Sequence, residues 1–70
     1  MIVKQGNTYL GMVGGREINR RVNIIEIRNS GKEYVRWTQI KKDGTHGKSS
    51  WTEKSKFEEW AKGLYEEGDK

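Results

Sequence analysis

The sequence predicts a mainly β domain: a curved five-stranded sheet or small barrel with one C-terminal α-helix. Hydrophobic residues make up 31% of the 70 residues, and there is no Pro to interrupt a strand. These hydrophobic residues are mostly Ile, Val, Trp and Tyr, which favour the half-buried faces of strands. The C-terminal part instead repeats its apolar positions with the period of a helix. A chain of this length forms one domain, residues 1–70.

Two strands are expected in the first part of the chain, near residues 8–13 and 21–28, and a short strand over residues 2–4 would precede them. Between the two longer strands, the glycine pair 14–15 is expected to open an irregular polar loop. In the second strand the apolar positions change phase at the adjacent isoleucines 24–25. This change predicts a bulge, or a strand covered on both faces.

Two further strands are expected near residues 33–42 and 48–52. The dipeptide Asp43-Gly44 lies between them and is typical of a tight type I′ hairpin. With the preceding strand they form a three-stranded meander. Five short strands in so small a chain need a strongly curved sheet, because a flat one would leave its edges unpaired.

The strand over residues 33–42 carries aromatic rings on both of its faces. Alternation sends Val35 and Trp37 one way, and Tyr34, Arg36 and Thr38 the other way, with Ile40 near the hairpin end. We expect Val35 and Trp37 to face the interior. If the helix instead covers the opposite side, both faces serve the fold.

A helix is expected over residues 55–66, where apolar residues recur at helical spacing. Ser55 and Glu58 have the spacing of a capping box at its start. The apolar stripe is expected to pack in the core. It consists of Phe57, Trp60, Ala61, Leu64 and Tyr65.

Positive charge is concentrated in the strand-rich part of the chain. Residues 1–50 hold ten Lys or Arg against four Asp or Glu, and residues 51–70 hold four against six, which gives the net charge of +4. This asymmetry predicts a negatively charged partner, nucleic acid above all. The alternative is that the charge only keeps a small domain soluble.

Few residues of the sequence are suited to catalysis. There is no Cys, and the single histidine, His46, falls in the expected turn DGTHGK. A phosphate-binding GxxxxGK[ST] motif is absent from the sequence. We therefore expect no enzymatic activity, no cofactor and no metal site.

Basic residues are interleaved with aromatic residues along the expected strands. Lys and Arg neutralise phosphates, and an exposed aromatic ring stacks on nucleic-acid bases for about 1–3 kcal/mol each. We expect this surface to bind the phosphate backbone of nucleic acid. The predicted binding residues are Arg21, Arg28, Tyr34, Arg36, Thr38, Lys41, Lys42 and Lys48.

The stretches GNTYLGMVGG, RRVNIIEI, EYVRWTQI, DGTHGKSSW and FEEWAKGL follow one another in a layout that resembles the SH3-like small barrels. Small phage proteins of similar shape share this layout. More narrowly, residues 24–66 resemble the seven-kilodalton archaeal chromatin proteins in the turn SGKEY, the hairpin DGTHGK and the polar link TEKS before a final helix.

The resemblance to the chromatin proteins implies a three-stranded face that lies across the DNA minor groove, with a Trp and small residues at the contact. The matching positions here are Arg36, Trp37 or Tyr34, Thr38, Lys48 and Ser49. That family has a compact, Lys-rich first hairpin, whereas this sequence has the longer, Gly-rich stretch GMVGGREIN.

Two alternatives to nucleic-acid binding stay open. One is a protein-binding module, such as a phage-encoded inhibitor of a host protein, with contacts from residues 12–19, residues 43–48 and an edge strand. The other is a structural homodimer that buries one face of the sheet. The start of the sequence has no secretory apolar core and no run of about 20 apolar residues occurs, so we expect a cytoplasmic protein without membrane contact.

Overall fold

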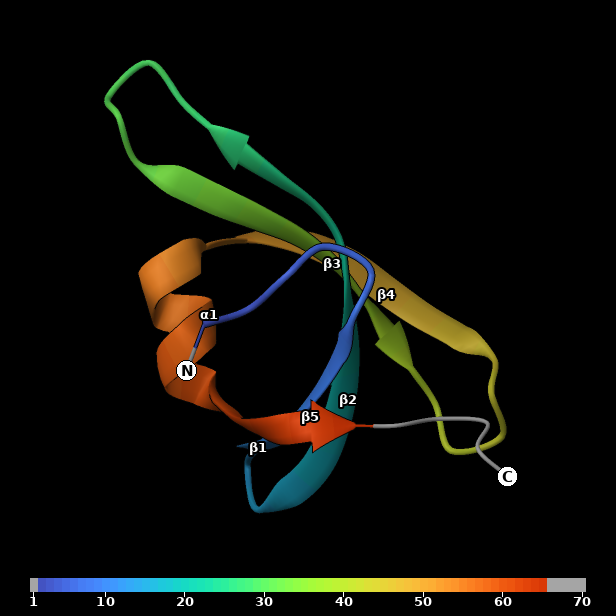
Figure 1. The fold of residues 1–70 in the computed structure, drawn as a ribbon. Helices are drawn as coiled ribbons and strands as arrows, with labels where there is room; N and C mark the ends of the chain where they lie inside the picture. Colours follow the sequence, from blue (N-terminus) through green and yellow to red (C-terminus); the bar gives the residue numbers. More distant parts are fainter. Residues whose placement is uncertain (1, 66–70) are drawn as a thin grey trace.

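The computed structural model describes residues 2–65 as one five-stranded antiparallel sheet with a single short helix (Figure 1). The elements are β1 (Thr8–Val13), β2 (Arg16–Ile27), β3 (Glu33–Ile40), β4 (His46–Glu53), α1 (Lys54–Trp60) and β5 (Ala61–Tyr65). In space the strand order is β4-β3-β2-β1-β5. The predicted fold class, mainly β with one helix near the C-terminus, is confirmed.

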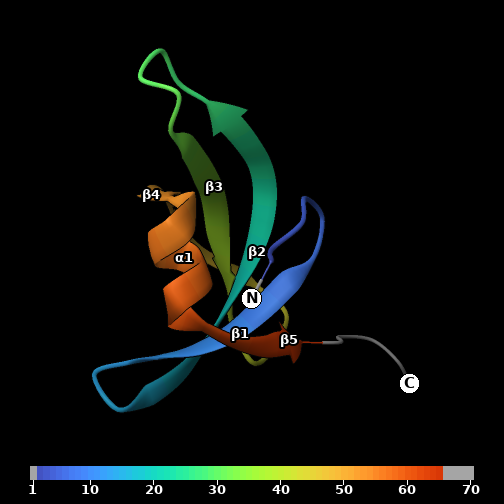
Figure 2. The ribbon, with the colours of Figure 1, turned by 60° about the vertical axis from the view of Figure 1, so that its left-hand side comes forward.

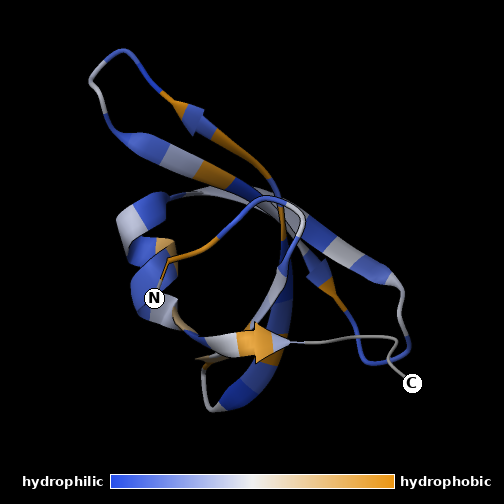
Figure 3. Cartoon of the chain, in the orientation of Figure 1, coloured by the Kyte–Doolittle hydropathy of each residue, from blue (hydrophilic) through white to orange (hydrophobic). Residues whose placement is uncertain are grey.

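The sheet curls around its core, and α1 lies across its open side between β4 and β5 (Figure 1). The hairpin of β2 and β3 extends beyond the body as an arm, which both ribbon views show (Figures 1 and 2). Along these two strands, hydrophilic and hydrophobic residues alternate, as expected where one face meets the core (Figure 3). No helix within residues 2–65 is long and apolar enough to cross a membrane.

The predicted strand bounds hold best for β1, which spans residues 8–13 as expected. Strand β2 begins at Arg16, five residues before the predicted start, because Gly14 and Gly15 form a tight turn rather than an irregular loop. Both glycines have positive φ angles, 58° and 81°, as a two-residue turn between twisted strands requires. The expected short strand over residues 2–4 is wrong, since these residues are not in a strand.

The turn between β3 and β4 is longer than the type I′ hairpin that the sequence predicts. Lys41 donates its N–H to the carbonyl of Thr45, and Gly44 donates to the carbonyl of Lys41. Only Gly44 has a positive φ there, 88°, so Asp43 does not take the conformation of a type I′ turn. Strand β3 therefore ends at Ile40 instead of residue 42, and β4 spans residues 46–53 instead of 48–52.

The predicted helix over residues 55–66 is wrong in its second half. Helix α1 ends at Trp60, and Ala61–Tyr65 form β5, which pairs with β1; residue 66 lies outside the described part of the chain. Pairing with β1 satisfies backbone groups that would otherwise form a bare sheet edge. Gly63 also weakens a helix at this point by about 1 kcal/mol relative to Ala, which favours the strand.

The predicted capping box does not form at the start of α1. The N-cap residue is Glu53, without a side-chain capping bond, and Ser55 Oγ lies 3.4 Å from Glu53 Oε2. Glu58 Oε2 instead accepts hydrogen bonds from the backbone N–H of Val3 and from Lys54 Nζ, both at 3.0 Å. Glu58 thus ties the N-terminal segment to the helix.

The core lies between the inner face of the curved sheet and α1. Phe57 is fully buried, and its ring meets that of Tyr9 edge to face with centroids 6.1 Å apart. From the predicted helical stripe, Phe57 and Ala61 are in the core, whereas Leu64 is 50% exposed because it sits on β5. The core residues are Val3, Tyr9, Val22, Val35, Trp37, Phe57 and Ala61, with Ile25 and Trp60 packed against them.

A bulge in β2 gives the core two residues that strict alternation would separate. Val22 lies opposite Trp37 and Ile24 lies opposite Arg36, so Asn23 is the extra residue. After the bulge, Ile25 returns to the inner face. The predicted bulge is confirmed, and it lies just before the adjacent isoleucines.

Trp60 packs directly on the backbone of β1 at Gly11. A Cβ atom at Gly11 would overlap the Trp60 indole ring. The indole Nε1 donates a hydrogen bond to the carbonyl of Met12 at 3.1 Å. The absence of a side chain at Gly11 is therefore what lets α1 close over this end of the sheet.

Gly11→Ala should lower the free energy of unfolding by about 1–3 kcal/mol, because the new methyl group must displace the Trp60 ring. Urea unfolding measures the effect. Gly63→Ala is the matched control, since a Cβ there meets nothing within 4 Å. Equal stability of the two variants would contradict the packing of Trp60 on Gly11.

Glu58→Gln should destabilise the protein at pH 7, and the difference in stability from wild type should become much smaller in acid. Partial burial acts to raise the pKa of Glu58, but the hydrogen bonds from Lys54 and Val3 outweigh it and hold the pKa below its ordinary value. A carboxylate with a lowered pKa stabilises the fold above the unfolded pKa, about 4.3, and this contribution is lost as the pH falls through the folded pKa.

Thermal unfolding of wild type and Glu58→Gln between pH 7 and pH 3 measures this dependence. Glu59→Gln, at the exposed neighbouring carboxylate, is the control and should change little at any pH. A gap between wild type and Glu58→Gln that stays constant down to pH 3 would show that the ionised carboxylate is not what matters.

Candidate functional site

The two faces of β3 divide as the sequence predicts. Val35 and Trp37 are 0% and 4% exposed and face the core, whereas Arg36 is exposed and Tyr34 and Thr38 are half-buried on the outer side. Ile40, expected near the outer face, is buried instead. The register with β4 shifts beside Ile40: Thr38 lies opposite Ser49 and Ile40 opposite His46, so the extra residue is on β4.

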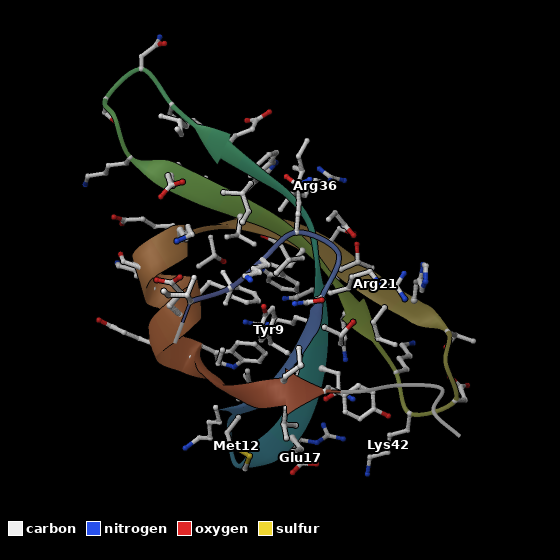
Figure 4. All side chains as sticks on the ribbon, in the orientation of Figure 1. Tyr9, Met12, Glu17, Arg21, Arg36 and Lys42 are labelled. Carbon is white, nitrogen blue, oxygen red and sulfur yellow. The ribbon has the colours of Figure 1, made fainter. Side chains whose placement is uncertain are left out.

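Cross-strand pairing assembles a polar and aromatic surface on the outer side of β2, β3 and β4. Arg36 lies opposite Ile24 on β2 and opposite Trp51 on β4. Figure 4 shows Arg36 and Arg21 outside the sheet and Tyr9 in the interior. We call this surface the outer face; it comprises Arg21, Asn23, Ile24, Glu26, Arg28, Tyr34, Arg36, Thr38, Ser49, Trp51 and Glu53.

Two arginines gather around the aromatic rings of the outer face. The guanidinium carbon of Arg28 lies over the Tyr34 ring, 4.3 Å from its centroid, and over the Trp51 ring, 4.9 Å from its centroid. The guanidinium carbon of Arg36 lies 6.0 Å from the Trp51 centroid. Both arrangements fall within the range of cation–π attraction.

Trp51 is the residue of this surface that sequence reasoning missed. Its strand was expected, but its position opposite Arg36 depends on the length of the β3–β4 turn and on the register shift beside it. No local sequence pattern predicts the turn length or the register shift. The nearest signal in the sequence is that Trp51 and Ser49 are two residues apart and so share a face.

The polar end of the outer face is a short hydrogen-bonded row. Asn23 Nδ2 donates to Thr38 Oγ1 at 2.7 Å, and Thr38 Oγ1 lies 2.7 Å from Ser49 Oγ. Arg21 lies opposite Thr38 across β2 and β3. Hydroxyl groups beside an arginine are common donors to phosphate and sugar oxygens.

The charge of the outer face is balanced only in part. Its cations are Arg21, Arg28 and Arg36, and its acids are Glu26 and Glu53. Glu26 Oε1 lies 3.9 Å from Arg28 Nε, and Glu53 Oε2 lies 4.0 Å from Lys32 Nζ. Within residues 2–65, Arg36 has no carboxylate partner in an ion pair.

Three of the predicted binding residues lie away from the outer face. Lys41 and Lys42 follow the end of β3 and line a cleft of about 520 Å³ between the start of β2 and the end of β3. Figure 4 labels Lys42. Arg16 contributes a third cation to this cleft, and Glu17 an acid. Lys48 lies in the irregular part of β4, between His46 and Ser49, and the register of β4 with β3 gives it no partner.

Arg20 shows that position, and not charge alone, decides the role of an arginine here. Its guanidinium carbon lies 3.9 Å from the Trp37 centroid and 4.4 Å from the Trp60 centroid, on the inner side of the sheet. Burial lowers the pKa of Arg20, and its Nε is buried without a hydrogen-bond partner in the described part of the chain. Arg20 belongs to the packing around Trp60.

Comparison of the chain with protein-family models, with curated proteins and with solved structures found no match. The resemblance to SH3-like barrels and to chromatin proteins therefore stays a prediction. On the outer face, arginines and aromatic rings converge on one surface of the sheet.

Proposed function

We propose that the protein is a small, non-enzymatic domain that binds nucleic acid through the outer face. The observation that supports this most is the gathering of Arg28 and Arg36 around Trp51 and Tyr34 on an exposed sheet surface. Such a surface combines phosphate neutralisation with flat rings, the two features that bind nucleic acid with little regard to sequence.

Arg36 is the cation best suited to a phosphate. It is exposed and has no ion-pair partner among the described residues, so contact with a phosphate breaks no existing salt bridge. The hydroxyl groups of Thr38 and Ser49 lie two residue pairs further along the sheet, on the same face, and can contact the same strand of nucleic acid. Lys41 lies five positions after Arg36, about 16 Å along an extended chain, so the basic cleft lies at one end of the same sheet.

A protein partner is the second candidate, favoured by one separate feature. Met12 and Val13, beside the β1–β2 turn, are 42% and 45% exposed. Apolar side chains at an exposed turn suit contact with another protein, such as a host protein or a second copy of this chain. For the nucleic-acid function we propose the cytoplasm as the location.

Binding of labelled DNA and RNA oligonucleotides, followed by fluorescence anisotropy, should weaken steeply between 50 and 200 mM salt. The double variant Arg28→Gln/Arg36→Gln should bind at least about tenfold more weakly at 50 mM salt. Its salt slope should also be smaller, by about 1 for each phosphate contact that is lost.

The control is Lys56→Gln/Lys62→Gln, which removes the same charge at two exposed positions on α1 and β5. If this control weakens binding as much as Arg28→Gln/Arg36→Gln does, the outer face is not the binding site. If wild type binds neither DNA nor RNA at 50 mM salt, the nucleic-acid function is wrong. A single protein recovered from nuclease-treated lysate would then support the second candidate.

A further inference from the structure

The guanidinium group of Arg28 is held in place more firmly than an exposed arginine usually is. It lies over two rings at once, those of Tyr34 and Trp51. Its backbone is fixed at the base of the arm's turn, where its N–H donates to the carbonyl of Lys32 and its carbonyl accepts from Gly31. The nearby carboxylate of Glu26, 3.9 Å from Nε, limits its movement further.

This arrangement leaves part of the group open to a ligand. The Arg28 side chain is 44% exposed although it contacts two rings. A guanidinium is planar and weakly hydrated, so one flat side can rest on aromatic rings while the other receives a second flat group. Nucleobases stack on arginine planes in this way as well as on aromatic rings.

A base can use this surface only if its own flat side is free. In a duplex each base is stacked between its neighbours, whereas unpaired bases can turn outward onto a protein. Arg36 lies on the same Trp51 ring and is available to the phosphate next to such a base. The outer face is thus matched to a single strand, with one base and one adjacent phosphate as its minimal ligand.

We infer that the outer face selects single-stranded nucleic acid by stacking an unpaired base on the Arg28 guanidinium, which lies over the Tyr34 and Trp51 rings. This inference rests on the proposed nucleic-acid function and adds the class of ligand. It assigns Arg28 a role that depends on its planar shape, and Arg36 a role that depends on its charge.

Three 12-nucleotide DNA ligands test the choice of strand with the wild-type protein: a single strand, its duplex, and an abasic strand with the same phosphates. The single strand should bind at least about tenfold more tightly than either of the others at 100 mM salt, because only it offers stackable bases. A single-stranded RNA of the same sequence should behave like the DNA single strand.

Arg28→Lys tests the role of the guanidinium, since lysine keeps the charge and loses the plane. It should weaken binding of the single strand about tenfold and leave the abasic strand unchanged. The role proposed for Arg36 needs only its charge, so Arg36→Lys should weaken either affinity less than about threefold. Trp51 is the tryptophan on the outer face, so quenching of tryptophan fluorescence by the single strand should disappear in Trp51→Phe.

The results separate the inference from the function on which it rests. Equal binding of the single strand and the abasic strand, or tighter binding of the duplex, overturns the inference and leaves nucleic-acid binding standing. Absence of binding to all ligands at 50 mM salt overturns both. If Arg28→Lys fails to fold, as thermal unfolding would show, the wild-type comparison of normal and abasic strands still decides.

Discussion

The rest of the structure depends on the pairing of β2 with two different neighbours. This strand of 12 residues pairs with β1 through Arg16–Arg21 and with β3 through Asn19–Ile27. Only its middle is paired on both sides. A strand shared in this way has to twist and bend between its two partners, and the bulge at Asn23 makes the bend possible.

The bend in β2 determines which residues lie on each face of the sheet. On the inner side, the bulge brings Val22 and Ile25 to the core although they are three positions apart, a spacing that strict alternation would place on opposite faces. On the outer side, the second half of β2 leaves the body as part of the arm, which carries Arg28 at its far end. There Arg28 meets Tyr34 of β3 and Trp51 of β4, so the fold that buries the core also builds the outer face.

Arginine and tryptophan side chains also pack together where α1 closes over the sheet. Trp60 lies on the bare backbone of Gly11, and Arg20 fills the space against the Trp37 and Trp60 rings. Arg20 and Arg28 both contact two aromatic rings, yet one has a buried Nε and the other a half-exposed side chain. An arginine that contacts two aromatic rings thus contributes to packing on one face of this sheet and is a candidate for ligand binding on the other.

Tertiary structure decided that Val35 and Trp37 face inward. The sequence by itself determined the mainly β class, the bounds of β1 and the grouping of Val35 and Trp37 on one face of their strand. Each of these is a local property: β-branched and aromatic composition, or strict alternation along one strand. It also predicted Arg21, Arg28, Tyr34, Arg36 and Thr38 as candidate contacts, and the tertiary structure places all five on one surface. The end of α1 at Trp60, the place of Trp51 and the separation of Lys48 from the outer face were decided only by tertiary structure. They depend on which strand needs an edge partner, on turn length and on register, and a shift of one residue in register moves a side chain to the other face of a sheet.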